Sequence, residues 1–270
     1  MNATFKPFLV KLHWLTASQF GLDPLRFIRS VRGIPAFVGD WVHFRKTYAG
    51  SMRFMPCLHD RYEEAGTTKT EYFWQDLLVA QWIFEARPRR HVDVGSRIDG
   101  FVAHVASYRE IEVFDVRPIN TRIPGVIFRQ ADLTDADPST RAEGYCDSVS
   151  CLHAVEHFGL GRYGDPIDST GYKRGIENMA RLLSPGGRLY LSTPVGFERV
   201  EFNAHWVLDP GTVLDCARAN GLRLEQLTVI GRDGTVQPCE ASESALRALA
   251  SAPYNLGVFV FTKSPSAVAT

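Results

Sequence analysis

From about residue 91 onward, short runs rich in β-branched and aromatic residues alternate with helical stretches. The runs that we expect to form strands are residues 91–94, 111–114, 126–128, 147–150, 188–192, 224–230 and 256–261. Helical stretches follow the first, fourth and fifth runs, and strands that alternate with helices predict a parallel arrangement. The last two runs lack a helical crossover of that kind, which allows an antiparallel final strand. The sequence therefore predicts an α/β fold with a doubly wound, mostly parallel seven-stranded sheet.

Composition and charge exclude several classes of protein. Hydrophobic residues make up 45% of the chain and charged residues 22%, as in soluble globular proteins. The net charge is zero, so we expect no nucleic-acid partner. The five cysteines form no C-x-x-C pair, which favours a reducing cytoplasm over a disulfide scaffold or structural zinc. No apolar run is long enough for a membrane span, and we expect no signal peptide.

The N-terminal part, residues 1–69, differs from the rest and is expected to form a helical extension. Its first 50 residues hold seven basic and two acidic side chains. Asp23 followed by Pro24 indicates a helix start, and a second helical segment is expected over 34–48. This extension either packs as a cap on the main domain or contacts anionic lipid or a pyrophosphate-bearing substrate, giving a cytoplasmic protein that can lie at a membrane surface. Residues 70–263 would form the sheet domain, opening with a helix over 70–86, and residues 264–270 a disordered tail.

A glycine turn follows the first expected strand. Gly95 lets the backbone approach a ligand closely, and Asp99 is placed to cap the next helix. Asp115 ends the second strand, 20 residues after Gly95, where a carboxylate can accept hydrogen bonds from ribose hydroxyls. Asp132 follows the third strand, where it could accept from an adenine amino group. Alternatively, the aspartates at these strand ends only cap helices and turns.

The motifs over residues 90–263 together resemble those of class I S-adenosylmethionine-dependent methyltransferases. The motifs that carry the resemblance are Asp93-x-Gly95, Asp115, Asp132, Asp147-Ser-Val-Ser-Cys-Leu-His153-Ala-Val-Glu156-His157 and Leu183-Ser-Pro185-Gly186-Gly187. More narrowly, the first motif and Tyr72-Phe-Trp-Gln75 resemble a bacterial subfamily associated with surface-polysaccharide biosynthesis. The resemblance implies a Rossmann-like methyltransferase sheet and S-adenosylmethionine as cofactor. Its implied cofactor contacts are Asp93, Gly95, Ser96, Arg97, Asp115, Val116, Asp132 and Leu133.

Two positions in the glycine loop depart from the family pattern. Arg97 stands where the superfamily has its second glycine, and Asp99 stands at the third. The Arg97 side chain either narrows the space for the methionine part of the cofactor or pairs with its carboxylate. The sequence leaves both alternatives open.

Histidines and a glutamate follow the fourth expected strand. His153 and His157 are four residues apart, and Glu156 stands beside His157. A methyl transfer to oxygen needs a base, so His157 is the first choice of base, with Glu156 orienting it and His205 as the second choice. We assign no metal. A divalent ion held by His153, Glu156, His157 and Asp147, or a purely structural role, remains an alternative.

Substrate contacts are expected from His153, Arg162, Tyr163 and Asn203, the middle two on a glycine-rich loop. The predicted function is O-methylation of a sugar, nucleotide-sugar or glycan in polysaccharide biosynthesis. A binding or scaffold protein of a glycan-assembly complex, which keeps the fold without catalysis, is the alternative. A nicotinamide-dependent oxidoreductase is weaker, because the G-x-G-x-x-G loop is missing. The sequence does not set the oligomeric state.

Overall fold

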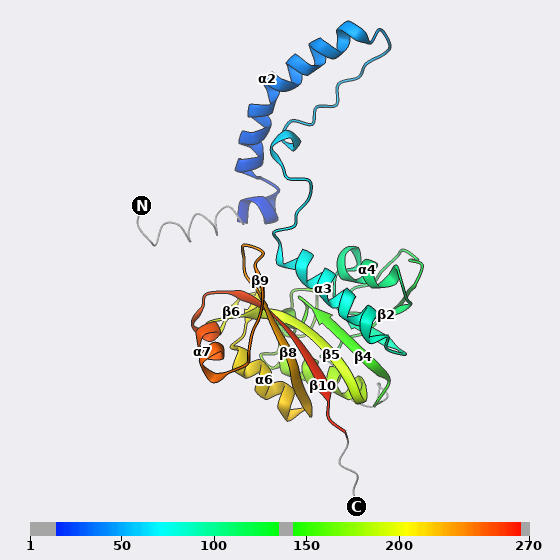
Figure 1. Ribbon diagram of the computed structural model, residues 1–270, viewed down its shortest axis with the longest axis vertical. Helices are drawn as coiled ribbons and strands as arrows, with labels where there is room; N and C mark the ends of the chain where they lie inside the picture. Colours follow the sequence, from blue (N-terminus) through cyan, green and yellow to red (C-terminus); the bar gives the residue numbers. More distant parts are fainter. Residues whose placement is uncertain (1–14, 135–142, 266–270) are drawn as a thin grey trace, which may run out of the picture. The chain divides into compact units, whose positions relative to one another are not determined.

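The computed structural model describes residues 15–134 and 143–265 (Figure 1). The chain divides into two compact units, Met1–Thr67 and Thr68–Thr270. Of the tail expected to be disordered, residues 266–270 lie outside the described part. Among the described helices, none is long and apolar enough to cross a membrane.

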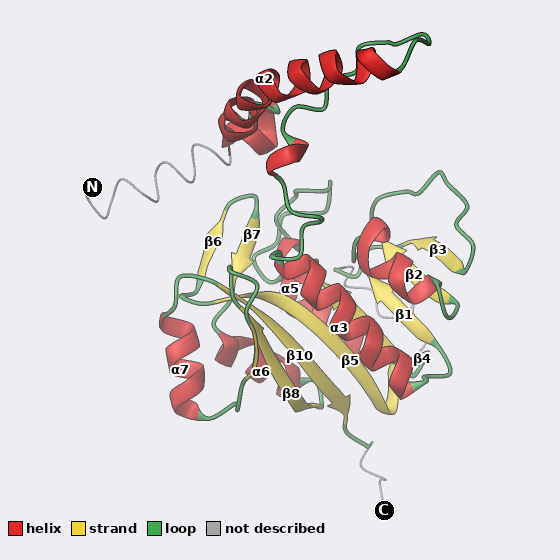
Figure 2. Cartoon of the chain, turned by 45° about the horizontal axis from the view of Figure 1, so that its top comes forward, coloured by secondary structure: helices red, strands yellow, loops and turns green. Residues whose placement is uncertain are grey.

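The second unit is built on a single large sheet with the strand order β3-β2-β1-β4-β5-β10-β8-β9 (Figures 1 and 2). Its strands are β1 (His91–Val94), β2 (Ile111–Asp115), β3 (Val126–Gln130), β4 (Cys146–Leu152), β5 (Leu183–Val195), β8 (Leu222–Ile230), β9 (Val236–Pro238) and β10 (Asn255–Lys263). The first five strands pair in parallel. β10 pairs antiparallel with both β5 and β8. The expected doubly wound, mostly parallel α/β sheet is confirmed, including its antiparallel final strand.

Three short strands were not expected from the sequence. β9 adds an eighth strand at the edge of the main sheet, pairing antiparallel with β8. β6 (Arg199–Glu201) and β7 (His205–Val207) form a separate two-stranded sheet. Each of the three has only three residues, which is too short for alternation of polar and apolar residues to stand out.

Helices cover both faces of the main sheet (Figure 2). They are α3 (Glu71–Ala86), a helical turn (Ile98–Val102) continuing into α4 (Ala103–Ala106), α5 (Gly171–Leu182), α6 (Pro210–Ala219) and α7 (Glu243–Ser251). Side chains of α3 and α4 share one hydrophobic cluster with Tyr190, while those of α5 and α6 share the other with Leu189 and Leu191. Neighbouring residues of β5 thus face opposite layers, as the pleat requires.

The helix α3 begins and ends where its sequence predicts. The Thr70 hydroxyl oxygen accepts a hydrogen bond from the Phe73 amide, which caps the first turn. Arg87 follows the helix in a left-handed conformation, with a φ of 48°, and Pro88 prevents continuation. This helix carries Glu71 and Tyr72, and it leads directly to β1.

The first unit contains α2 (Pro24–Thr47), preceded by a helical turn (Leu15–Gln19) and followed by another (Asp60–Tyr62). The Asp23 carboxylate accepts hydrogen bonds from the amides of Leu25 and Arg26, as its N-cap position predicts. We expected two helical segments here, and the structure has one continuous helix. Pro35 lies inside this helix. Its fixed φ is compatible with a helix, although its missing N–H removes one backbone hydrogen bond.

Candidate functional site

A pocket of about 510 Å³ opens at the carboxyl ends of β1 to β4. Parallel strands bring these ends to one edge of the sheet, which is where α/β folds bind ligands. The predicted site residues that line it are Gly95, Ser96, Arg97, Asp115, Val116, Asp132, Leu133, His153, His157, Arg162 and Tyr163. Asp93, Glu156, His205 and Asn203 are outside its lining. The volume lies within the range of small-molecule sites.

Gly95 makes the turn between β1 and the pocket. Its φ of +70° belongs to the left-handed region that favours glycine. Its amide donates to the Phe114 carbonyl oxygen at 2.9 Å, which ties the turn to β2. A Cβ at this position would lie 3.0 Å from the Ala154 Cβ. The position therefore combines close packing with a φ that would strain any residue with a Cβ, as expected where a backbone passes beside a ligand.

Asp93 lies behind the pocket and holds the loop from inside. Its side chain is fully buried, and its oxygens accept hydrogen bonds from the Ser96 amide (3.0 Å), the Ser96 hydroxyl (2.6 Å) and the Ser150 hydroxyl (2.5 Å). Burial raises the pKa of Asp93 to about 7, although these hydrogen bonds oppose the shift. The Leu152 amide donates to the Ser96 hydroxyl oxygen at 3.0 Å. Asp93 therefore orders the turn after β1 from behind.

Arg97 lies in the pocket wall and pairs with Asp99. Its Nε and Nη2 atoms donate to the two carboxylate oxygens of Asp99 at 3.1 and 2.8 Å. Its guanidinium carbon also lies 5.4 Å from the centre of the Tyr72 ring. The expectation that Asp99 caps the next helix is wrong, because Asp99 lies inside the helical turn Ile98–Val102 and its carboxylate binds Arg97 instead.

Asp115 already has a partner from its own loop. Its oxygens accept hydrogen bonds from the Arg117 amide (2.8 Å), Nε (3.0 Å) and Nη2 (2.7 Å). The guanidinium carbon of Arg117 also lies 4.3 Å from the centre of the Tyr163 ring. Arg117 thus connects the expected ribose-binding carboxylate with the glycine-rich loop. A ligand hydroxyl at Asp115 must share the carboxylate with Arg117 or displace it.

The third strand end supplies the remaining wall of the expected cofactor site. One Asp132 oxygen accepts hydrogen bonds from both the amide and the hydroxyl of Thr134, each at 2.7 Å. This turn holds Leu133 in the pocket lining, where Phe114 and Val116 also lie. The arrangement offers an apolar slot beside a carboxylate, which suits a flat heterocycle with an amino group.

His153 is buried between two carboxylates. Its Nδ1 lies 2.7 Å from a Glu156 oxygen, and its Nε2 lies 3.3 Å from a Glu71 oxygen. Burial lowers the pKa of His153, but the two carboxylates outweigh it and raise that pKa to about 9. The imidazolium stacks on Tyr72 at 4.4 Å between ring centres. Tyr254 donates to the same Glu71 oxygen at 2.7 Å.

His157 lies at the pocket wall with a defined tautomer. Its Nδ1 lies 2.7 Å from the Ala204 carbonyl oxygen, so Nδ1 carries the hydrogen and Nε2 carries the lone pair. Arg162 donates to the same carbonyl oxygen at 2.9 Å. The Glu156 oxygen is 3.9 Å from Nε2. Burial lowers the pKa of His157, with Arg162 adding to the shift and Glu156 opposing it, so the ring is neutral at neutral pH.

The other two predicted residues of this region belong to the segment that forms β6, β7 and the connection between them. His205 begins β7 and is partly buried, and burial lowers its pKa. Its ring centre lies 6.3 Å from that of Tyr254, outside the pocket lining. Asn203 is exposed in the connection between β6 and β7. The structure therefore places His157 in the pocket lining and His205 outside it.

The alternative metal set is not brought together. Asp147 lies near the amino end of β4, where its carboxylate accepts hydrogen bonds from the amides of Arg89 and Arg90, both at 2.8 Å. His153 follows the opposite end of the same strand. Six residues of extended chain span roughly 20 Å, so the two side chains cannot bind one ion. The four-ligand metal hypothesis is therefore wrong.

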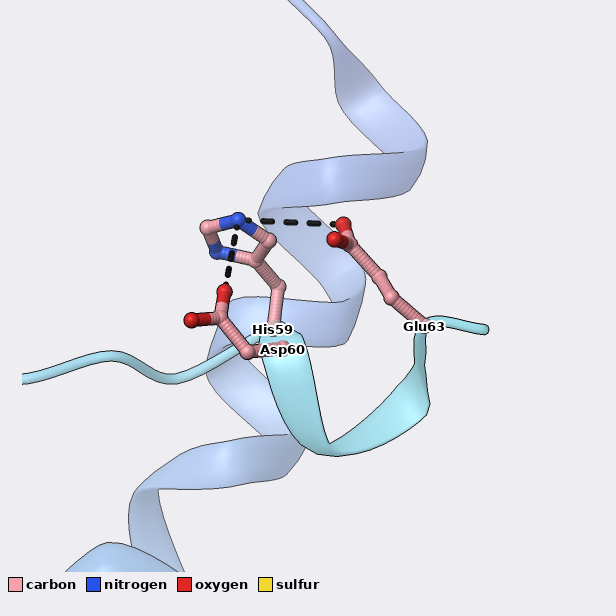
Figure 3. Close-up of side chains that lie close together, drawn as sticks. All are labelled: His59, Asp60 and Glu63. Carbon is pink, nitrogen blue, oxygen red and sulfur yellow. Dashed lines mark ion pairs between the residues drawn. The ribbon is translucent and has the colours of Figure 1, made fainter. Parts of the chain in front are cut away.

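A different group of possible metal ligands occurs in the first unit. Within the described residues, the only group of three or more clustered possible metal ligands is His59, Asp60 and Glu63 (Figure 3). The His59 Nε2 atom lies 3.1 Å from Asp60 and 3.7 Å from Glu63. The Arg26 guanidinium reaches the same nitrogen at 2.8 and 3.1 Å. This guanidinium occupies the place a cation would need, so we assign no metal there.

Sequence reasoning missed two charged residues that order the site. Arg117 could have been suspected, since it stands two residues after Asp115 at a strand end. Glu71 gave no signal, because it lies 82 positions before His153 and meets it only through the packing of α3 on the sheet. Glu71 lies in the first turn of α3, where a carboxylate is favourable, so its charge has a sufficient local reason in the sequence.

Part of the chain matches a protein family in sequence. Residues 129–213, less than half of the chain, match the family described as Caenorhabditis protein of unknown function, DUF268. The matched stretch runs from β3 into α6 and contains the segment with His153, Glu156 and His157. No curated protein matches the chain in sequence.

Solved structures of similar fold were also found. The [4+2]-cyclase SpnF is 15% identical with a TM-score of 0.49, over 71% of this chain and 82% of that one. A 1,6-didemethyltoxoflavin-N1-methyltransferase from Burkholderia thailandensis, with S-adenosylhomocysteine bound, is 14% identical with a TM-score of 0.47, over 90% and 91%. The N-methyltransferase NodS from Bradyrhizobium japonicum, in complex with S-adenosylhomocysteine, is 12% identical with a TM-score of 0.47, over 75% and 95%. At these identities the likeness concerns the fold, and the chemistry of this chain rests on its own residues.

Proposed function

We propose that this protein is an S-adenosylmethionine-dependent methyltransferase that acts on a hydroxyl group. The observation that carries the proposal is the shared pocket, which places the Gly95 turn, Asp115 and Asp132 together with a neutral His157. On this proposal, the strand ends with Asp115 and Asp132 bind the nucleoside, and His157 serves as the base in the same cavity.

The residues present fit the cofactor at three places. Asp115 can accept from ribose hydroxyls, because a carboxylate offers about four acceptor positions and Arg117 uses three donors. The slot beside Asp132 suits adenine. Arg97 lies in the lining, where its guanidinium can leave Asp99 for the cofactor's carboxylate, as both are exposed and the pair is weakly held.

When bound, S-adenosylmethionine supplies a methyl group on a positively charged sulfur, which is already a good leaving group. The task of this chain is then to align the acceptor oxygen and remove its proton. The lone pair on His157 Nε2 can take that proton, because the Ala204 carbonyl keeps the hydrogen on Nδ1. Glu156 stabilises the imidazolium that forms, since its oxygen is 3.9 Å from Nε2.

The acceptor that we propose is a sugar, nucleotide-sugar or glycan, which would place the enzyme in polysaccharide biosynthesis. Arg162 and Tyr163 support this class, since a guanidinium can bind phosphate and an aromatic ring can stack on a sugar. The His157 and Tyr163 rings meet edge to face at 5.6 Å, so an acceptor stacked on Tyr163 would lie close to the base.

The alternative function is a non-catalytic binding or scaffold protein with the same fold. Two ion pairs favour it, because Arg117 occupies Asp115 and Asp99 occupies Arg97. Asp115 and Arg97, the two charged side chains that the cofactor would need, thus already have partners within the chain.

Two experiments separate the two functions. The first measures the binding of S-adenosylmethionine and S-adenosylhomocysteine by calorimetry, and a ligand at about 100 times its dissociation constant should also stabilise the fold by about 2.7 kcal/mol. The second measures the release of S-adenosylhomocysteine from S-adenosylmethionine in the presence of a panel of nucleotide-sugars. Binding with turnover supports the enzyme, binding without turnover on any acceptor supports the scaffold, and absence of binding refutes the methyltransferase.

A further inference from the structure

The helix α2 presents an apolar face to solvent. The side chains that form this face recur every three or four residues, as on one side of a helix. Each is between 46 and 69% exposed, and they are Phe27, Ile28, Val31, Ile34, Val38 and Val42. We call this set the apolar face of α2. Six large apolar side chains on one stripe exceed the scattered exposure that is normal for a protein surface.

The segment that follows α2 leaves this face uncovered. It packs on a different side of the helix, where a Cβ at Gly33 would lie 1.9 Å from the Leu58 carbonyl oxygen. Phe54 contacts the rings of Phe37 and Trp41 at 5.7 and 5.5 Å between centres. Within residues 15–67, the unit therefore covers one side of α2 with its own side chains and leaves the apolar face uncovered.

The charge of the helix indicates what that surface is. Of its 24 residues, one is acidic, Asp40, and its carboxylate pairs with Arg61. The basic residues of the helix are Arg26, Arg29, Arg32, Arg45 and Lys46. Arg26, Arg29 and Arg32 project from the other side of the helix, by helical spacing, and Arg45 and Lys46 lie at its end. An apolar stripe with a basic polar face is the pattern of helices that lie in a membrane interface.

We infer that α2 docks this protein on an anionic lipid bilayer. The apolar face enters the headgroup boundary, and the basic side chains remain at the level of the lipid phosphates. A second copy of the chain fits less well, because a dimer packed through the apolar face would point Arg26, Arg29 and Arg32 away from the interface and would give their charge no anionic partner. The inference does not depend on the proposed methyl transfer.

Vesicle sedimentation with the full chain tests this inference. The protein should bind vesicles of equal parts phosphatidylglycerol and phosphatidylcholine, and binding should fall with added salt and be weak on phosphatidylcholine alone. The double variant Val31→Asp/Val38→Asp should lose about tenfold or more in partitioning, because it places charges on the apolar face. Arg29→Glu should lose about fivefold or more on anionic vesicles. Phe197→Asp is the matched control and should bind normally, since Phe197 is similarly exposed, at 66%, in the sheet unit.

Three results would overturn the inference. The first is no sedimentation with anionic vesicles, and the second is equal binding by the wild type and the double variant. The third is a dimer in analytical ultracentrifugation that Val31→Asp/Val38→Asp dissociates, which would assign the apolar face to a second copy. Circular dichroism of each variant shows that α2 remains folded, so a loss of binding reports the face itself.

Discussion

The Nδ1 atom of His157 lies 2.7 Å from the backbone carbonyl oxygen of Ala204. A carbonyl oxygen only accepts hydrogen bonds, so this contact fixes the hydrogen on Nδ1 and leaves Nε2 as the basic nitrogen. Arg162 donates to the same oxygen at 2.9 Å and so holds the connection in place. The small β6–β7 sheet therefore sets the tautomer of a side chain that follows β4, in the way outer partners orient catalytic histidines.

If His157 is the base, His157→Ala should lower turnover by about 10²- to 10⁴-fold. Cofactor affinity should stay near that of the wild type, because His157 is expected to touch the acceptor. Steady-state kinetics and calorimetry measure the two quantities separately. His205→Ala is the matched control, since His205 lies outside the pocket lining. Full turnover in His157→Ala with loss in His205→Ala would move the base to β7.

The pH profile of the wild type gives a second measure of the same base. The neutral ring is the active form, so kcat/KM should rise as the pH passes the pKa of His157. Burial, with Arg162 adding and Glu156 opposing, lowers that pKa below the usual value of about 6.5. The profile should therefore already be flat at neutral pH, and a chelator should leave it unchanged. Loss of activity with chelator would show that a metal is required.

Asp115→Ala should weaken S-adenosylmethionine binding by about 1.5–3 kcal/mol, the scale of hydrogen bonds to a charged group. Calorimetry of the folded variant measures this. Arg117→Ala should leave binding unchanged or improve it, because Arg117 competes for the same carboxylate. Asp233→Ala is the control, since Asp233 makes a similar turn with Thr235 in an exposed loop. Wild-type affinity in Asp115→Ala would contradict the ribose assignment.

Arg97 should bind the carboxylate of the cofactor. Arg97→Lys should then weaken S-adenosylmethionine binding clearly, because lysine cannot make the two-pronged contact. The same variant should bind 5′-methylthioadenosine normally, since that ligand lacks the carboxylate. Asp99→Asn should improve S-adenosylmethionine binding by releasing Arg97. If Arg97→Gly binds the cofactor as well as the wild type, the side chain is an obstruction and the scaffold function gains support.

The buried His153 should make stability depend on pH. Its pKa is raised to about 9, mainly by Glu156 and Glu71 against the opposing effect of burial, compared with about 6.5 when unfolded. The stabilisation is therefore complete below about pH 6.5 and is lost as the pH rises towards 9. Thermal unfolding of the wild type should show a fall in Tm across this window, and His153→Gln should flatten it. An equal fall in Tm in the wild type and the variant would show that a group other than His153 causes the pH dependence.

The sequence by itself predicted the seven main strands, the helix after Thr70 and the cap at Asp23. These features depend on local physics, since alternation, capping and proline positions act within a few residues. The order of strand ends then followed from parallel pairing, which is why Gly95, Asp115 and Asp132 could be expected at one pocket. The same reasoning divided this region into two helical segments, whereas the structure has one continuous α2 with Pro35 inside it.

Only the tertiary structure decided which side chains meet. Ala204 is 47 residues from His157, and Glu71 is 82 positions from His153, so no local pattern links them. The opposite case is Asp147 and His153. They are only six residues apart and were grouped as possible metal ligands, but β4 holds them near its two opposite ends. Charge and hydrogen-bond partners depend on distances in space, and those distances exist only after the helices have packed on the sheet.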